Sequence, residues 1–168
     1  FLECTTMGAL VEALTLSNSQ YVRRLILGGG SNILFTRDFD GVVIHPLITG
    51  IETLAEDEES ITLRVGAGVE WDSLVEYSVN QGFGGLENLS LIPGNVGASP
   101  IQNIGAYGVE VKDSIEWVEG LFIDNQKPFI LKNNECNFGY SDSIFKNELK
   151  GQVVVTHVVF KLSKQPSL

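Results

Sequence analysis

The sequence contains little cysteine and no long apolar stretch, and each absence excludes a class of protein. Its two cysteines, Cys4 and Cys136, lie far apart and form neither a CxxC pair nor a cysteine–histidine cluster, so neither a disulfide framework nor a metal site is indicated. No stretch reaches the roughly 18 apolar residues of a membrane-spanning helix. The N-terminal residues also lack the basic start of a signal peptide. We therefore expect a cytoplasmic protein without a membrane partner.

Basic residues are scarce as well. The 11 Lys and Arg against 21 Asp and Glu give a formal net charge of −10 at pH 7. A chain of this charge repels phosphate backbones at long range, which argues against nucleic acid as a partner. What the sequence does contain is apolar residues, 43% of 168, which suffice for a buried core in one domain or two small ones.

The hydrophobic pattern predicts helices and strands without a regular strand–helix–strand alternation. Two helices are expected, over residues 7–16 behind a cap at Thr5 or Thr6, and over residues 70–82 with Trp71, Leu74, Val75 and Val79 on one side. Strands are expected at residues 25–27, 41–45, 59–68 and 152–163, and a hairpin over residues 114–132 with its turn at 125–127. We therefore predict an α+β fold with a mainly antiparallel sheet.

Glycine is present in excess, at 18 of 168 residues against a usual share of about 7%. Much of the excess falls in residues 28–30 and 82–108, so function is to be sought there. The second region contains IPGNVGASPIQNIGAYG, residues 92–108, which has no charged side chain although the whole chain is acidic. Large apolar residues such as Ile92 and Ile101 are unusual in linkers, so we expect this neutral segment to be ordered.

Two interpretations of the neutral segment remain open from its residues alone. Its backbone N–H groups can cradle a polar, phosphorylated ligand without cations. Alternatively, its glycines only allow two elements to pack closely in a buried loop.

The earlier glycine cluster, in LILGGGSN, follows a predicted strand. It lacks both the GK[ST] of a P-loop and the last glycine of GxGxxG, which argues against those two phosphate-binding motifs. The consecutive amides of Gly29, Gly30, Ser31 and Asn32 can nevertheless form an anion-binding nest.

Four segments of the chain, in their order along the sequence, together indicate a family: LILGGGSNILF, VGAGVEWDSLVEY, GLENLSLIPGNVGASPIQNIGAYGVEV and ECNFGYSDSIFK. Over nearly the whole chain they closely resemble the UDP-N-acetylenolpyruvoylglucosamine reductase (MurB) family of bacterial peptidoglycan synthesis. The resemblance implies an FAD-binding domain of the vanillyl-alcohol-oxidase type, with two small subdomains over residues 1–66 and 67–168. It also implies FAD and NADPH as cofactors and a UDP-sugar as the small-molecule substrate.

In that family, hydride passes from NADPH to FAD and then to the enolpyruvyl group of UDP-N-acetylglucosamine enolpyruvate, which gives UDP-N-acetylmuramate. The family's proton-donor serine lies in a C-terminal substrate-binding domain that this sequence does not match. We therefore expect the chain to be a truncated flavin domain of a monomeric enzyme, inactive by itself.

The resemblance also implies site residues, motif by motif. The pyrophosphate and ribityl part of FAD would be lined by Leu27, Gly28, Gly29, Gly30, Ser31, Asn32, Ile33 and Leu34. The rest of the flavin would be approached by Ile92, Pro93, Gly97, Ser99, Pro100, Asn103, Ile104, Gly105 and Ala106. Tyr107 would lie near the substrate, and Tyr140 and Ser141 occupy a catalytic motif.

Ser141 departs from the family pattern, because an arginine that engages the substrate's carboxylate normally follows the tyrosine. Serine carries no charge, and the loss of such a contact costs about 10²- to 10³-fold in rate. Three interpretations remain open: a natural paralogue with weakened or altered activity, an engineered knock-out, or compensation by Lys146. Ser141 also motivates a rival hypothesis for the whole chain, a catalytically silent flavin- or nucleotide-binding module.

The other conspicuous residues are expected to be structural. His45 and His157 lie in apolar runs without a partner in register. Residues 57–59 are expected to form a solvated acidic turn. The remaining residues in this group, expected to pack or to make structural hydrogen bonds, are Trp71, Trp117, Cys136, Glu87 and Glu110.

Overall fold

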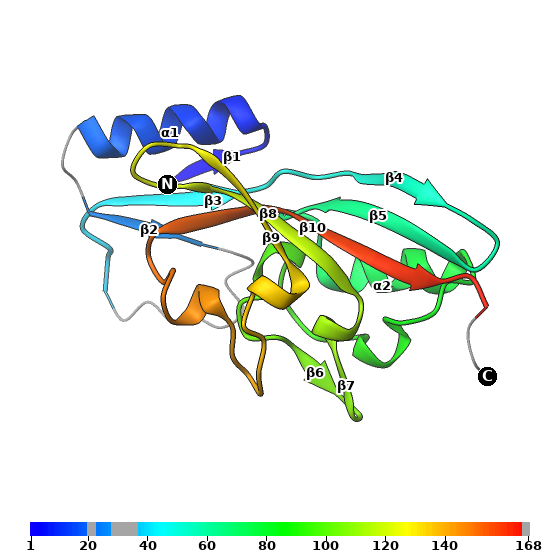
Figure 1. Ribbon diagram of the computed structural model, residues 1–168. Helices are drawn as coiled ribbons and strands as arrows, with labels where there is room; N and C mark the ends of the chain where they lie inside the picture. The colour runs from blue at the N-terminus through cyan, green and yellow to red at the C-terminus, as the bar shows by residue number, and fades with distance from the viewer. Residues whose placement is uncertain (20–22, 28–36, 166–168) are drawn as a thin grey trace.

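The computed structural model describes residues 1–19, 23–27 and 37–165, which form two main β-sheets with a helix packed on each (Figure 1). The smaller sheet is parallel, with the strand order β1 (Leu2–Cys4), β3 (Val42–Pro46) and β2 (Arg24–Ile26). Helix α1 (Met7–Ser19) lies over it. The helix begins where predicted because Thr6 Oγ1 accepts a hydrogen bond from the N–H of Ala9 at 3.1 Å.

The larger sheet is antiparallel, with the order β4, β5, β10, β8 and β9. These strands are β4 (Ile51–Glu56), β5 (Ser60–Gly66), β8 (Ile115–Phe122), β9 (Pro128–Lys132) and β10 (Val153–Ser163). Strand β10 lies in the centre, which explains why its sequence is almost continuously apolar. The hairpin of β8 and β9 confirms the prediction, and Gln126 in its turn has a φ of 56°.

Helix α2 (Trp71–Asn80) lies below the larger sheet, and short elements fill the rest of this side (Figure 1). They are η1 (Glu87–Leu89), η2 (Val96–Ala98), β6 (Gly105–Ala106), β7 (Val109–Glu110), η3 (Val111–Asp113), η4 (Asn133–Glu135) and η5 (Ile144–Lys146). The neutral segment therefore forms η2, β6 and the turns around them.

Two hydrophobic clusters make up the core. The first lies between the larger sheet and α2, where Leu63 and Val65 of β5 join Trp71 of the helix. The second lies around α1 and the smaller sheet, and it also takes in Leu121 and Val154 from β8 and β10. Because the second cluster draws on both sheets, burial of its apolar surface holds them against each other.

Some expectations differ from the structure. The smaller sheet is parallel, whereas the sequence predicted mainly antiparallel pairing. Strand β4 was not predicted, because it is an edge strand whose residues from Glu52 to Glu56 are all exposed. Val79 is 51% exposed, and Ser78 is buried on α2 in its place. The division into units at residue 66 stays a prediction; the strand pairing changes sheets between β3 and β4.

Candidate functional site

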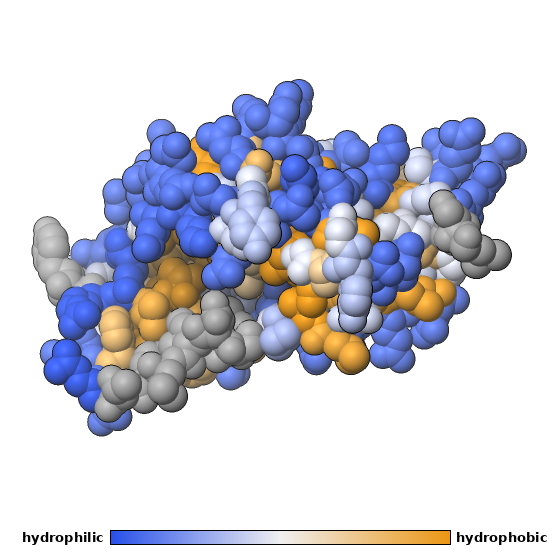
Figure 2. Space-filling model, turned by 90° about the horizontal axis from the view of Figure 1, so that it is seen from below, coloured by the Kyte–Doolittle hydropathy of each residue, from blue (hydrophilic) through white to orange (hydrophobic). Residues whose placement is uncertain are grey.

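A cavity of about 400 Å³ lies between the smaller sheet and the start of β10. Its lining is mostly apolar and comes from Arg24, Leu25, Ile26, Leu27, Pro46, Ala67, Asn95, Gly97, Ala98, Ile101, Ile123, Phe145, Leu149, Lys150, Gly151, Val153, Val154 and Val155. Figure 2 shows apolar residues gathered in the middle of the molecule's lower face, with polar residues around them. The cavity begins beside Leu27, directly before the first glycine cluster in the sequence.

Charge distinguishes this cavity from the rest of the chain. Among the described residues that line it none is acidic, although the chain has a net charge of −10, and two are cationic. The guanidinium of Arg24 donates to Ser17 Oγ at 3.2 Å and lies 3.8 Å from the carboxylate of the exposed Asp124. The other cation, Lys150, is exposed. An apolar cavity with cations and no carboxylates suits a ligand that combines ring systems with phosphate.

The neutral segment forms one wall of the cavity by pairing with the chain that follows β5. Trp71 N–H donates to the Gly94 carbonyl at 2.9 Å, Val96 N–H to Val69 at 2.8 Å, and Gly97 N–H to Ala67 at 3.0 Å. Gly97 is buried so closely here that a Cβ would lie 2.5 Å from the Ala67 Cβ. Close packing against Ala67 therefore accounts for a glycine at position 97.

The cradle interpretation finds less support in this part of the segment. The amides of Val96, Gly97 and Ser99 all donate to carbonyls of the protein. The Ser99 hydroxyl likewise donates to the Val96 carbonyl, at 2.7 Å. These N–H and O–H groups hold the cavity wall together. Backbone N–H groups that bind a ligand would therefore have to belong to other residues.

Asn103 connects the neutral segment to a second turn. Its side chain is 2% exposed, and its Nδ2 donates to Glu110 Oε2 at 2.6 Å and to the Gly139 carbonyl at 2.9 Å. Its Oδ1 accepts the Lys112 N–H at 3.0 Å. Glu110 thus makes the structural hydrogen bond expected of it, and so does Glu87, which accepts from Gly85 N–H at 2.6 Å.

Two exposed tyrosines mark the turns that Asn103 connects. Tyr107 lies between β6 and β7 and is 91% exposed, with a φ of 53°. Tyr140 is 94% exposed, and the following Ser141 has a φ of 48°. Both turns extend from the lower side of the molecule in Figure 1. Such left-handed backbone in non-glycine residues is costly and is often found at functional sites.

The other predicted site residues divide into two groups. Gly28, Gly29, Gly30, Ser31, Asn32, Ile33 and Leu34 lie outside the described residues. Within the described part, Leu27 and Gly97 line the cavity. The predicted residues that are not among its lining residues are Ile92, Pro93, Ser99, Pro100, Asn103, Ile104, Gly105 and Ala106. The sequence missed Ile123, Phe145 and the start of β10, because an apolar lining residue has the same sequence signature as a core residue.

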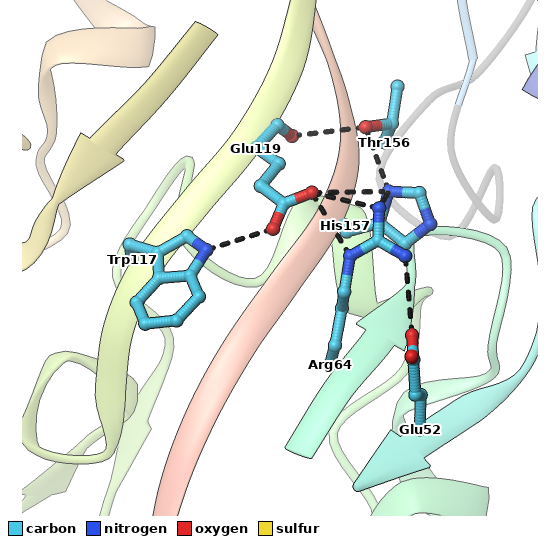
Figure 3. A network of polar contacts seen from close by, with 6 residues as sticks. All are labelled: Glu52, Arg64, Trp117, Glu119, Thr156 and His157. Carbon is cyan, nitrogen blue, oxygen red and sulfur yellow. Dashed lines mark hydrogen bonds and ion pairs between the residues drawn. The ribbon is translucent and has the colours of Figure 1, made fainter. Parts of the chain in front are cut away.

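A network of polar side chains lies on the face of the larger sheet opposite the first hydrophobic cluster (Figure 3). Arg64 donates to Glu119 Oε1 at 2.9 Å and lies 3.5 Å from Glu52. Trp117 Nε1 donates to Glu119 at 2.9 Å, so Trp117 is half-buried in the network and not in the core as predicted. The network reaches the cavity wall because the carbonyl of Thr156 accepts the Ala67 N–H at 2.9 Å.

His157 has partners here, contrary to the prediction. Its Nδ1 lies 3.3 Å from Arg64 Nη2, which can only donate, and 3.0 Å from the Thr156 hydroxyl, so a neutral imidazole with Nδ1 as the acceptor fits both contacts. Burial, together with the charge of Arg64, lowers the pKa of His157. Burial alone would raise the pKa of Glu119, but hydrogen bonds from Arg64 and Trp117 outweigh it and lower that pKa. The network fits a structural role for His157. Cys136, which lies outside this network, is buried as expected, and burial raises the pKa of its thiol to about 12.

Stability is expected to fall in acid through His157. Its pKa is lowered in the folded state, so the unfolded chain binds the proton more readily below about pH 6.5. The free energy of unfolding should therefore drop by up to about 1 kcal/mol between about pH 7.5 and about pH 5.5 from this group. Urea unfolding at both pH values checks this, and the drop should be smaller in His157→Gln. Equal drops in the two proteins would contradict the assignment.

No helix among the described residues is long and apolar enough to cross a membrane. The same residues contain no group of three or more His, Cys, Asp and Glu side chains placed to hold a metal ion. A parallel sheet and an antiparallel sheet that meet at an acid-free cavity define a domain built to bind a cofactor or another small molecule.

Comparison with known proteins gives the family. Residues 1–124 match the family described as FAD binding domain, and the chain belongs to this family. It is 52% identical over 162 residues to a UDP-N-acetylenolpyruvoylglucosamine reductase of Amoebophilus asiaticus, covering 96% of this chain and 48% of that protein. A reductase of the same name from Bacteroides fragilis is 54% identical over 141 residues, or 84% of this chain and 42% of that protein. The chain thus spans about half the length of the curated relatives it matches.

Solved structures agree on the fold. The UDP-N-acetylenolpyruvylglucosamine reductase (MurB) of Thermus caldophilus superposes with a TM-score of 0.77 at 26% identity, covering 98% of this chain and 55% of that one. A p-cresol methylhydroxylase shares the fold alone, with a TM-score of 0.67 at 15% identity over 99% of this chain and 36% of that one. The predicted fold class, an FAD-binding domain of the MurB and vanillyl-alcohol-oxidase type, is confirmed.

Proposed function

We propose that the chain is the FAD-binding part of an NADPH-dependent reductase that converts UDP-N-acetylglucosamine enolpyruvate into UDP-N-acetylmuramate, a peptidoglycan precursor. Relatives that carry the reductase name, at 44–54% identity, support the substrate and the reaction. The enzyme would act as a monomer in the cytoplasm on a small UDP-sugar, and this chain alone would not turn the substrate over.

The observation that carries the proposal is the acid-free cavity at the end of β2. A flavin dinucleotide combines flat ring systems with a pyrophosphate, so it needs apolar surface without nearby carboxylates. The cavity supplies the apolar surface through residues such as Leu27, Ile101 and Val155, and cations through Arg24 and Lys150. A volume of about 400 Å³ is within the range of pockets that hold part of such a ligand.

The chain's own residues would bind and orient the cofactor. Leu27 and Gly97 would line its site, and the N–H groups of Gly29, Gly30 and Ser31 would bind the pyrophosphate. When bound there, FAD would supply the redox chemistry, which is hydride transfer from a nicotinamide to a double bond. The closely packed wall at Gly97 would keep water away from the ring system.

A second candidate is a flavin- or nucleotide-binding module without catalytic activity. It is favoured by one observation: Ser141, where the family resemblance implies an arginine, is an exposed residue without charge in this chain. A module of this kind would bind FAD and leave the enolpyruvyl substrate unchanged.

FAD titration of the purified chain tests the proposal. Flavin fluorescence should be quenched on binding, and the melting temperature should rise with FAD concentration because the ligand binds only the folded state. The protein encoded by the whole reading frame should then oxidise NADPH only when the enolpyruvyl substrate is present. Quenching without turnover would favour the silent module, and absence of FAD binding would refute the reductase and the flavin-binding form of the module.

A further inference from the structure

Strand β10 contains a β-bulge where it passes the cavity. Its pairing with β8 shifts register between Val155 and His157, so Thr156 is inserted as an extra residue. Val155 and Val158 both belong to the first hydrophobic cluster, although residues three positions apart in a regular strand point to opposite faces. The bulge therefore allows Val155 to line the cavity and leaves Thr156 beside His157 in the polar network.

The backbone of Thr156 connects the bulge to the cavity wall. Its carbonyl accepts the N–H of Ala67 at 2.9 Å, and the carbonyl of Ala67 accepts the N–H of Gly97 at 3.0 Å. Val155, Ala67 and Gly97 all line the cavity. The position of the bulge therefore sets the position of three lining residues that come from different segments of the chain.

Arg64 and Glu119 hold the bulge from the polar face of the sheet (Figure 3). Arg64 donates to Glu119 Oε1 from Nε at 3.1 Å and from Nη2 at 2.9 Å, and the same Nη2 lies 3.3 Å from His157 Nδ1. Thr156 Oγ1 lies 3.0 Å from that ring nitrogen and 3.4 Å from the Glu119 carbonyl. The side chain of Glu119 is only 17% exposed, so this ion pair is better shielded from water than a surface pair.

We infer that Arg64 and Glu119 are positioning residues for the cofactor, because they fix the bulge at Thr156 and through it the cavity wall. This inference rests on the proposed function, since the ligand is FAD. Neither side chain is among the described residues that line the cavity, so both would act through the wall and not by contact. A wall already held in its binding position lowers the ordering cost of association. The alternative is that the pair adds only to the stability of the sheet.

FAD titration of the protein encoded by the whole reading frame, after removal of bound flavin, tests the inference. Arg64→Met and Glu119→Gln should each weaken FAD binding about 3- to 30-fold, the range for residues that act through others. The two variants change the net charge in opposite directions. A purely electrostatic effect on the anionic cofactor would make Glu119→Gln bind more tightly, whereas a displaced wall weakens binding in both.

The matched control is Lys164→Met, which breaks the ion pair between Lys164 Nζ and Glu56 Oε1 at 2.8 Å. It removes one positive charge, as Arg64→Met does, from the far end of the same sheet. Its FAD affinity should equal that of the wild type. Urea unfolding of every variant shows whether it is folded under the conditions of the titration.

A double variant covers the case in which Arg64→Met does not fold. Arg64→Met combined with Glu119→Gln leaves no unpaired carboxylate, so it should be more stable than Arg64→Met alone. Its FAD binding should be no weaker than that of the weaker-binding single variant, because both substitutions remove the same contact. Losses that simply add would show two independent effects and would contradict the inference.

The remaining outcomes separate this inference from the proposed function. FAD binding by the wild type with unchanged affinity in Arg64→Met and Glu119→Gln would leave the pair a stabilising role alone and would overturn the inference. Tighter binding in Glu119→Gln, or an equal loss in Lys164→Met, would indicate long-range electrostatics and would overturn it as well. Absence of FAD binding by the wild type would overturn the proposed function and the inference with it.

Discussion

Gly97→Ala is expected to lower the free energy of unfolding by about 1–3 kcal/mol and to weaken FAD binding by about tenfold. The physical reason is the wall of the cavity, where an added methyl group would lie 2.5 Å from the Cβ of Ala67 and 3.1 Å from its Cα. Neither backbone can retreat easily, because Gly97 N–H donates to the Ala67 carbonyl and Ala67 N–H donates to Thr156. Urea unfolding and fluorescence titration with FAD measure the two effects.

The steric clash with Ala67 that Gly97→Ala would create can be tested by removing the methyl group of Ala67 at the same time. In the double variant Ala67→Gly, Gly97→Ala, the shortest contact disappears and the remaining ones, at 3.1 Å and 3.3 Å, are only tight. A large part of the stability and of the FAD affinity should therefore return. Gly139→Ala is the control, because its Cβ would find Asp142 Cβ at an ordinary 3.7 Å. If Gly97→Ala and Gly139→Ala behave alike, close packing at Gly97 is not what the glycine provides.

The fold was predictable from the sequence where its signals are local. The apolar faces of α1 and α2, the cap at Thr6 and the run of apolar residues in β10 each follow from spacing or capping chemistry. Strand β4 was not predictable in this way, because an exposed edge strand lacks the alternation that reveals a buried face. The parallel pairing of β1 with β3 depends on a contact between residues far apart in the sequence.

The site was predictable only in part, and for a physical reason. Glycine and missing charge in residues 92–108 signalled an unusual backbone, and the structure places Gly97 in the cavity wall. The same signal could not tell a ligand cradle from a packing contact, since glycine serves both. Ile123 and Phe145 gave no signal, because burial against a cavity and burial in a core select the same side chains. The partners of His157 were missed because Arg64 and Glu119 lie on neighbouring strands. Trp117 was misjudged because its partner, Glu119 on the same strand, draws its indole N–H into the polar network.

Asn103→Ala is expected to lower the free energy of unfolding by about 3 kcal/mol. The substitution removes three hydrogen bonds, to Glu110 at 2.6 Å, to the Gly139 carbonyl at 2.9 Å and from Lys112 N–H at 3.0 Å. It also leaves an alanine at a φ of 45°, in the left-handed region that a Cβ disfavours. Chemical denaturation of the chain measures the loss.

Two further substitutions separate these causes. Asn103→Gly removes the same hydrogen bonds but relieves the left-handed backbone, so it should be less damaging than alanine by about 1 kcal/mol. Asn103→Asp keeps the shape, yet it sets a second carboxylate where Asn103 Nδ2 now lies 2.6 Å from Glu110. Its cost should therefore grow as the pH rises and both carboxylates ionise.

The same variants show whether Asn103 acts on function through position alone. It touches no lining residue of the cavity through these bonds, but it ties the turn with Tyr140 to the hairpin with Tyr107. In the protein encoded by the whole reading frame, Asn103→Ala should therefore raise KM for the substrate at temperatures where it is still folded. FAD affinity should change less than in Gly97→Ala. A larger loss of FAD affinity than in Gly97→Ala would instead place Asn103 against the cofactor, because only direct contact would outweigh a displaced cavity wall.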